Sequence, residues 1–148
     1  MGLKFHKQME YSFQDFLREK SAHFLPENTM KIDLHCHDHN SDVPDELWGR
    51  ILALPETYLP TKDLVSALKR EKVDLLTITN HNNARSCYDL LSKGHDVLVG
   101  AEFTVGMPEA DQFFHVLTYG FNPNQEEQLN LLRPNIYKFL SFTSPKNI

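Results

Sequence analysis

The sequence predicts an α/β fold in which strands alternate with helices and form a mostly parallel sheet, either a barrel or an open sheet. Two observations predict it. Short segments rich in branched apolar residues alternate with amphipathic helical patterns through the middle of the chain. Residues with metal-binding chemistry follow these segments, and parallel α/β folds gather functional residues at the carboxyl ends of their strands.

Capping and helix-breaking residues set the bounds of the expected helices. We expect helices over residues 11–23 with Ser12 as N-cap, over 61–72 with Thr61 as N-cap, over 83–93 with Gly94 as the stop, and from a capping box of Asn124 and Glu127 to Pro134. We expect strands over residues 30–37, 73–79, 97–103 and 112–121. Residues 40–60 contain three prolines and are expected to form a long loop that rests on the core through Trp48.

Length and composition indicate a globular protein. The chain has 148 residues and a formal net charge of −5, so nothing suggests a broad nucleic-acid surface. We expect residues 1–28 to form a helical extension and residues 29–148 to form the main domain. No run of about 18 apolar residues predicts a membrane span, and the N-terminus lacks a signal-peptide pattern. Cys36 and Cys87 are expected to be reduced core thiols, and a cytoplasmic location follows from these absences.

The segment Asp33-Leu-His-Cys-His37 is the most informative feature of the chain. In a strand, successive side chains point to opposite faces, so Asp33, His35 and His37 share one face while the alternate residues share the other. Two imidazoles and a carboxylate on a buried face are costly without compensation. A divalent metal ion compensates well, because neutral imidazole and carboxylate are both good ligands.

Residues of the metal-ligand type recur along the following strands. His81 stands just after the expected strand 73–79, Glu102 stands at the end of 97–103, and His115 lies within 112–121. A single histidine on an apolar face is usually a core residue. Four strands that each supply such a residue predict one shared metal centre, because carboxyl ends of parallel strands meet at the same edge of a sheet.

The order and spacing of these residues resemble the PHP (polymerase and histidinol phosphatase) domain family over about residues 29–121. The correspondence consists of His35-Cys-His37 with Ser41-Asp42, Thr79-Asn80-His81, Gly100-Ala-Glu102 and His115-Val-Leu117. The resemblance implies a distorted barrel of β/α units and a site with two or three divalent ions, manganese, zinc or iron, that hydrolyses phosphoesters.

The resemblance also implies roles for individual residues. It implies that His35, His37 and Glu102 bind one ion, that Glu102 bridges to a second ion held with His115, and that Asp42 and His81 belong to a third position or its neighbours. Asp33 and Asn80 are expected to orient the ligands from behind. Asp38 and Asp45 are expected to be loop carboxylates, and His39 a solvent-exposed loop residue.

Two departures from the family pattern affect the expected fold and site. The family ends its site with an Asp-x-His pair, but no histidine follows His115. The chain is also short for a full barrel, so we expect a partial barrel with an N-terminal helix, incomplete at its C-terminus. Its open edge would be covered by a second copy or by a further segment. The family's Asp before the histidine of the second motif is Asn80 here, and the missing charge is expected to weaken metal binding.

The predicted function is therefore metal-dependent hydrolysis of a phosphomonoester or phosphodiester, with a small phosphorylated substrate or nucleotide and no membrane partner. The alternative is a PHP-like metal-binding module with a structural or regulatory role and impaired catalysis. An amidohydrolase barrel shares the His-x-His strand, and residues 35–39 are similar to the metallo-β-lactamase motif with a spacing one residue short. The general acid and the substrate are not identified by the sequence.

Overall fold

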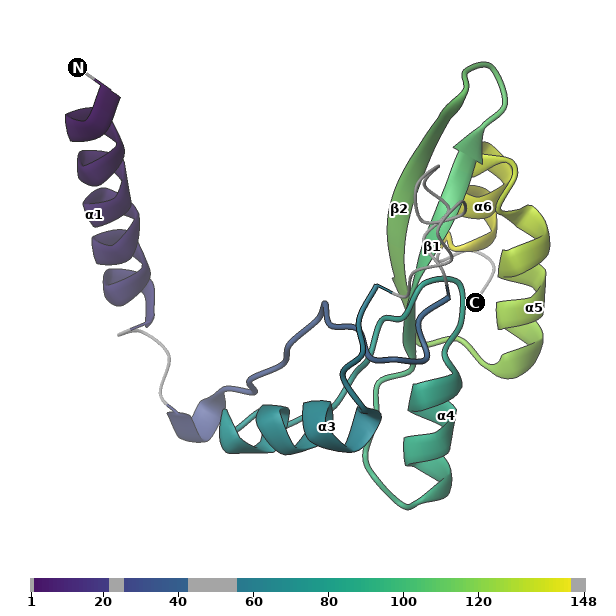
Figure 1. The fold of residues 1–148 in the computed structure, drawn as a ribbon, viewed down its shortest axis with the longest axis horizontal. Helices are drawn as coiled ribbons and strands as arrows, with labels where there is room; N and C mark the ends of the chain where they lie inside the picture. The colour runs from purple at the N-terminus through teal and green to yellow at the C-terminus, as the bar shows by residue number, and fades with distance from the viewer. Residues whose placement is uncertain (1, 22–25, 43–55, 145–148) are drawn as a thin grey trace. The chain divides into compact units, whose positions relative to one another are not determined.

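The computed structural model describes residues 2–21, 26–42 and 56–144, and the chain divides into two compact units, Met1–Met30 and Lys31–Ile148. The first unit holds the helix α1 (Gly2–Ser21) and the short 3-10 helix η1 (Pro26–Asn28) (Figure 1). The expected start of this helix, at Ser12, was wrong, because residues 3–10 are helix formers without Gly or Pro and the helix continues through them. None of the described helices is long and apolar enough to cross a membrane.

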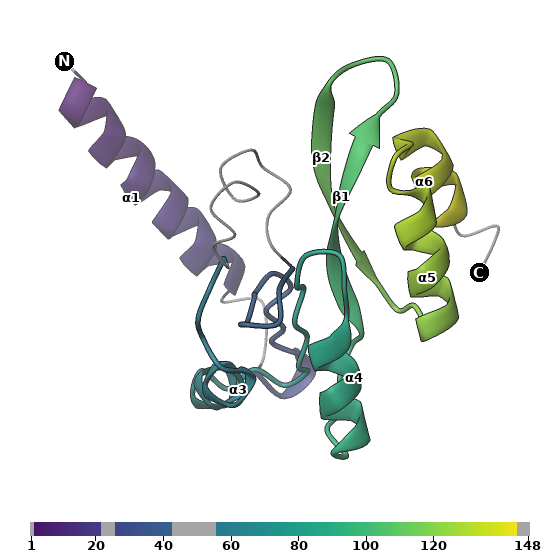
Figure 2. The ribbon, with the colours of Figure 1, turned by 45° about the vertical axis from the view of Figure 1, so that its right-hand side comes forward.

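The second unit is a small mixed α/β domain with a two-stranded antiparallel sheet. Its elements are α3 (Thr61–Arg70), α4 (Arg85–Ser92), β1 (Gly100–Met107), β2 (Gln112–Tyr119), α5 (Pro123–Leu132) and α6 (Ile136–Phe142). β1 and β2 form a hairpin in which Gly100 pairs with Tyr119 and Met107 pairs with Gln112. In Figures 1 and 2, α5 and α6 lie along one side of this hairpin. Among the described residues the strands do not close into a barrel.

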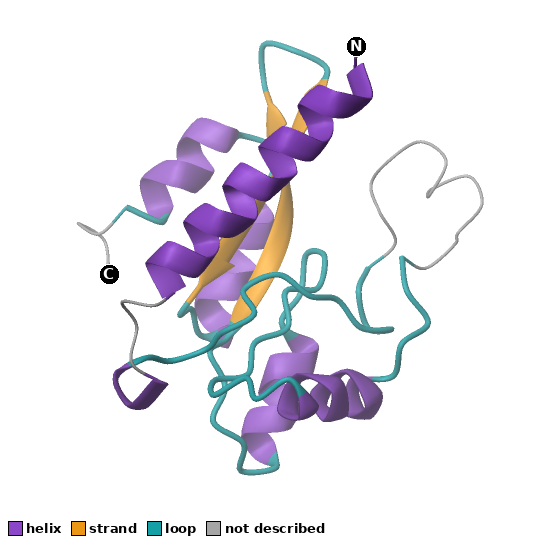
Figure 3. Ribbon diagram, turned by 90° about the vertical axis from the view of Figure 1, so that its left-hand side faces the viewer, coloured by secondary structure: helices purple, strands orange, loops and turns teal. Residues whose placement is uncertain are grey.

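The segments expected as strands over 30–37 and 73–79 lie side by side but are not continuous strands. The strand expected over 97–103 begins at Gly100, and it pairs antiparallel with β2, so the expected mostly parallel sheet was wrong. Isolated parallel bridges join Ile32 to Leu75, Leu76 to Val97, and His81 to Glu102. Figure 3 shows the described segments between η1 and β1, apart from α3 and α4, as loops. The strands expected over 30–37 and 73–79 are therefore wrong in extent, while their parallel order is present.

Side chains explain why these ladders are interrupted. The backbone N–H of Lys31 donates to Asp74 Oδ2 at 2.7 Å, and that of Cys36 donates to the Thr79 hydroxyl at 3.1 Å. The backbone N–H of Asp38 donates to Asn80 Oδ1 at 2.9 Å. Side chains that bind the backbone in this way replace ladder hydrogen bonds. Such polar side chains near the ends of neighbouring segments fix their separation without a regular sheet.

Two helix starts differ from those expected. Pro60, not Thr61, is the N-cap of α3, and the Thr61 hydroxyl donates to Asp38 Oδ2 at 2.6 Å instead. The capping box of α5 is formed by Asn122 and Gln125, two residues before the expected pair, and Pro123 follows the cap. Proline suits the first helical position because its fixed φ matches the helix and its missing N–H would have had no partner there.

Other expectations have mixed outcomes. Gly94, with φ of +82°, follows α4 as the expected stop, and the helix itself is shorter than predicted. The short helix α6 was not predicted at all. The expected packing of Trp48 in the loop lies outside the described residues.

The core of the second unit joins the hairpin to the helices that follow it. Phe103 of β1 is fully buried, and its ring packs against Phe121 and Phe139 with centroids 5.7 Å and 5.4 Å apart. Cys87 is fully buried and Cys36 is half-buried, and both are free thiols. Burial raises the pKa of the Cys36 thiol to about 12, with Asp33 adding to the effect, so the thiol stays protonated at neutral pH.

Truncating the α6 aromatic residue should destabilise the domain. We expect Phe139→Ala to lower the free energy of unfolding by about 3–5 kcal/mol, because a fully buried ring leaves a cavity. Urea unfolding measures this effect. Phe113→Ala is the matched control, because Phe113 is 60% exposed and should change stability by no more than about 0.5 kcal/mol. Equal effects in the two variants would mean that α6 does not belong to the core.

Candidate metal centre

Glu102 is the carboxylate around which the site is built. It is the third residue of β1, a strand whose side chains are almost all buried, and its own side chain is 7% exposed. Its backbone N–H donates to the carbonyl of Asn80 at 3.1 Å, and its carbonyl accepts from the N–H of Asn82 at 2.9 Å. These bonds fix Glu102 beside the segment that carries His81.

Gly100, two residues before Glu102, allows this packing. A Cβ atom at position 100 would lie 2.8 Å from the ring of Tyr119 and 2.9 Å from the hydroxyl of Thr77. Both distances are too short for a side chain, so only glycine fits at the start of β1. The close approach of β1 to Thr77 and Tyr119 brings Glu102 to the ends of the neighbouring segments.

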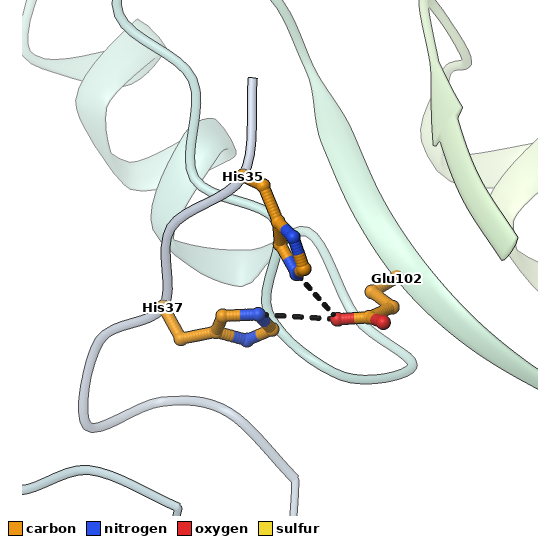
Figure 4. Close-up of side chains that lie close together, drawn as sticks. All are labelled: His35, His37 and Glu102. Atoms are coloured by element: carbon orange, nitrogen blue, oxygen red, sulfur yellow. Dashed lines mark hydrogen bonds and ion pairs between the residues drawn. The ribbon is translucent and has the colours of Figure 1, made fainter. Parts of the chain in front are cut away.

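His35 and His37 point at the same oxygen of Glu102. The Nε2 atoms of the two imidazoles lie 2.9 Å and 3.1 Å from Glu102 Oε2, as Figure 4 shows. They come from one extended segment and are two residues apart, so both project to the same side of the chain. This is the convergence that the His-x-His spacing predicts.

His81 and His115 also lie close to Glu102. His115 Nδ1 lies 3.0 Å from Glu102 Oε1, and His81 Nε2 lies 4.0 Å from Glu102 Oε2. His115 reaches Glu102 across the hairpin, because Leu117 is the residue paired with Glu102 and His115 stands diagonal to it. The rings of His35, His37, His81 and His115 form a row in which successive centroids are 5.0 Å apart.

Glu56 is a site residue that the sequence analysis missed. Its Oε2 atom lies 3.0 Å from His37 Nδ1 and 3.4 Å from His81 Nε2, and it accepts a hydrogen bond from the Ser41 hydroxyl at 3.1 Å. Glu56 stands in the long proline-containing segment, where no periodicity or motif distinguishes one carboxylate from another. Only the folded chain brings it to the histidines.

Among the described residues, three overlapping groups have ligand atoms close enough to hold a metal ion. In each group these atoms all lie within 4.8 Å of one another, and the groups are His35, His37 and Glu102; His37, Glu56 and His81; and His81, Glu102 and His115. Two ligand atoms that are each about 2.1 Å from an ion and stand at about a right angle are about 3 Å apart. The contacts of 2.9 Å and 3.1 Å between the imidazoles and Glu102 fit that spacing.

The electrostatics of the site favour the ligand forms of these side chains. Burial alone would raise the pKa of Glu102, but the hydrogen bond from His35 and the charges of His81, His35 and His115 bring it below its ordinary value. Burial lowers the pKa of His37, although Glu56 and Glu102 oppose the effect. An ionised carboxylate beside a neutral imidazole is the combination that binds a divalent cation.

Within the part of the chain that the structure describes, His37 Nδ1 and His81 Nδ1 have no hydrogen-bond partner. The approach of Glu56 to His37 Nδ1 is close enough for an ion pair, but it is not aligned as a hydrogen bond. Buried polar atoms normally have partners, and those that lack one need an explanation. The atoms that face Glu102 are Nε2 of both rings, so these Nδ1 atoms would carry the ring protons when Nε2 binds an ion.

The remaining predicted site residues lie around this cluster. Asp42 forms an ion pair with Arg85 and belongs to none of the three groups. Asp33 Oδ1 accepts from the backbone N–H of His35 at 3.2 Å. Asp38 lies in a loop, as expected, but its side chain is fully buried, where it accepts hydrogen bonds from Asn40, Thr61 and Asn80. His39 is exposed, as expected.

No protein-family model matches this chain, and no curated protein matches it significantly. The buried histidine and glutamate clusters therefore carry the functional argument.

Removing one ligand should lower the metal content of the purified protein. We expect His35→Ala to bind less Mn²⁺ or Zn²⁺ than the wild type after equilibrium dialysis. The reason is that His35 supplies one of the three ligand atoms in the group with His37 and Glu102. Elemental analysis measures the content. His39→Ala is the matched control, since His39 is an exposed histidine outside the three groups and should leave the content unchanged. Equal metal in both variants would reject the assignment of His35.

Proposed function

We propose that this chain is a metal-dependent phosphoesterase of the PHP type whose site holds two divalent ions bridged by Glu102. The observation that carries the proposal is the convergence of four histidines on the two oxygens of one buried carboxylate. The sequence motifs support the same conclusion, because His35, His37, His81, Glu102 and His115, which match the family pattern, are found together here, although Asp42 is not among them. The parallel order of the bridged segments is compatible with the first part of a distorted β/α barrel.

The number of ions follows from the lone pairs. A neutral imidazole offers one acceptor nitrogen, because the other nitrogen carries the proton. The group with Glu56 shares His37 with one group and His81 with the other, so it competes with both. The remaining two groups share only Glu102, whose two oxygens allow it to bridge. Two ions, held by His35 with His37 and by His81 with His115, therefore use every imidazole once.

In this arrangement Glu56 orients a ligand. When His37 Nε2 binds a cation, its proton resides on Nδ1, 3.0 Å from Glu56 Oε2. A carboxylate that accepts this N–H commonly fixes the tautomer and orientation of a ligating histidine, and a realignment of Glu56 would bring it into such a bond. The Ser41 hydroxyl links Glu56 to the backbone of His81, because it donates to Glu56 and accepts the His81 N–H at 2.9 Å.

The chemistry of phosphoester hydrolysis suits such a site. Divalent ions held by imidazole and carboxylate lower the pKa of water toward neutrality and neutralise the charge that develops on a phosphate. The chain's own contribution is rigid placement, because Glu102 is held by β1 and His115 by the paired strand β2. His35 is half-exposed at its side chain, so the group that contains it is open to solvent, from which a substrate would approach. We restrict the proposal to two ions because Asp42 is engaged by Arg85.

The second candidate function is a metal-binding module without catalysis. The engagement of Asp42 by Arg85 favours it, because this residue stands where the PHP pattern has a further ligand. The two functions make the same prediction for metal content and differ in turnover.

A phosphoester panel decides between them. We expect the Mn²⁺-loaded wild type to hydrolyse at least one phosphomonoester or nucleotide phosphodiester, and His115→Ala and Glu102→Ala to lower kcat/KM by more than about 100-fold, because metal-ion stabilisation of the transition state amounts to several kcal/mol. The measurement is phosphate or nucleotide release at saturating Mn²⁺.

Asp96→Asn is the control, since Asp96 is exposed and outside the site. Turnover that survives in Glu102→Ala would come from a contaminant and reject the proposed site. No turnover with metal still bound would support the non-catalytic module.

A further inference from the structure

Behind the histidines lies a second polar cluster that the metal site does not use. Asp38 is fully buried and Asn80 is 1% exposed, although neither is a metal ligand in the three groups. Asp38 follows His37 in the chain, and Asn80 precedes His81. Their contact therefore joins the two segments from which these two imidazoles project.

The hydrogen bonds of this cluster fix which side chain carries the charge. The Asn80 amide donates to Asp38 Oδ1 at 2.7 Å, and its oxygen accepts the backbone N–H of Asp38 at 2.9 Å. Asp38 also accepts from the Asn40 N–H at 2.9 Å and the Thr61 hydroxyl at 2.6 Å. The Asp38 side chain thus meets donors only, as an ionised carboxylate requires, and Asn80 must present its amide nitrogen.

This arrangement changes the meaning of Asn80. From the sequence, the missing carboxylate at position 80 looked like a lost charge. In the structure a carboxylate is present next to it, at position 38, and an aspartate at position 80 would place two acceptors face to face at the 2.7 Å contact. Two carboxylates at that distance cannot both stay ionised, so either one of them takes up a proton or the segments separate.

We propose that Asp38 and Asn80 are a positioning pair for the metal centre, in which the buried charge has its place at position 38 and the amide at position 80. The pair sets the 5.0 Å separation of the His37 and His81 rings from behind. It also acts on Glu102, because the carbonyl of Asn80 accepts the Glu102 N–H. The proposal rests on the metal centre of the proposed function, but not on phosphoester hydrolysis.

The test is a cycle of exchanges read out by Mn²⁺ affinity alone. Asp38→Asn removes the charge while keeping the shape. Asn80→Asp puts acceptor against acceptor. We expect each single exchange to weaken Mn²⁺ binding by about 10–100-fold, as changes behind metal ligands do. The double exchange, D38N/N80D, should bind more tightly than either single variant. Its recovery should be incomplete, because the Asn40 N–H loses its acceptor.

Mn²⁺ binding is measured by titration calorimetry at a temperature where circular dichroism shows that every variant is folded. This measurement separates an effect on ligand positions from an effect on stability. A merely structural pair would lower the urea midpoint and leave the Mn²⁺ dissociation constant unchanged. If Asp38→Asn does not fold, Thr61→Val replaces it in the binding test, because Thr61→Val removes one hydrogen bond to Asp38 and keeps the charge. It should weaken binding less than either single exchange. Asp96→Asn, an exposed change of the same charge, should leave the constant unchanged.

The outcomes are distinct. Tighter Mn²⁺ binding by Asn80→Asp, equal affinities in all folded variants, or a double exchange no better than the singles would each overturn the positioning pair and leave the metal centre intact. A wild type that binds no Mn²⁺ would overturn the metal centre and the pair together. The expected pattern without any phosphoester turnover would support the pair and reject the hydrolase.

Discussion

Placing the Glu102 carboxylate in a nearly solvent-free position is the constraint on which the rest of the site depends. An isolated buried charge costs several kcal/mol even after the protein relaxes. Here the compensation comes from His35, His37 and His115 at contact distances of 2.9–3.1 Å, with His81 slightly farther away. The imidazoles must therefore be brought to one point from three parts of the chain, which carry His35 with His37, His81, and His115. The hairpin, the bridged segments and the polar cluster behind them together hold the imidazoles in these positions.

The need to hold these ligands in place also accounts for the interrupted ladders between the bridged segments. A continuous parallel sheet would satisfy the backbone of residues 31–38 by itself, but the structure uses Asp74, Thr79 and Asn80 side chains for part of that task. These bonds tie the segment of His35 and His37 to the segment of His81 at several points. The Thr79 hydroxyl, for example, both accepts the N–H of Cys36 and donates to its carbonyl, each at 3.1 Å. Ligands on such doubly tied segments are preorganised for a cation, and preorganisation is what makes charge stabilisation effective in catalysis.

The sequence predicted which residues gather around Glu102 better than it predicted the secondary structure, and the reasons are physical. The histidine pair two residues apart, and Glu102 and His115 at later strand positions, can be recognised in the sequence because each depends only on the pattern of its own short segment. Segments that are joined only by isolated bridges cannot be recognised from the sequence in this way. The side chains that replace their ladder hydrogen bonds come from 41 to 43 residues away in the chain. Glu56 and the burial of Asp38 depend on long-range packing for the same reason. The start of α5 was displaced by two residues because two overlapping capping patterns were present and Pro123 decided between them.

The most direct test of a carboxylate bridging two ions is the electron paramagnetic resonance spectrum of the protein titrated with Mn²⁺. Two ions that share Glu102 would lie about 3.5–4 Å apart, as in other two-metal sites, and their spins would couple. The wild type should therefore show an exchange-coupled signal that grows up to two ions per chain, and Glu102→Ala should show none. A spectrum with only the six lines of isolated Mn²⁺, saturating at one ion per chain, would contradict the bridged centre.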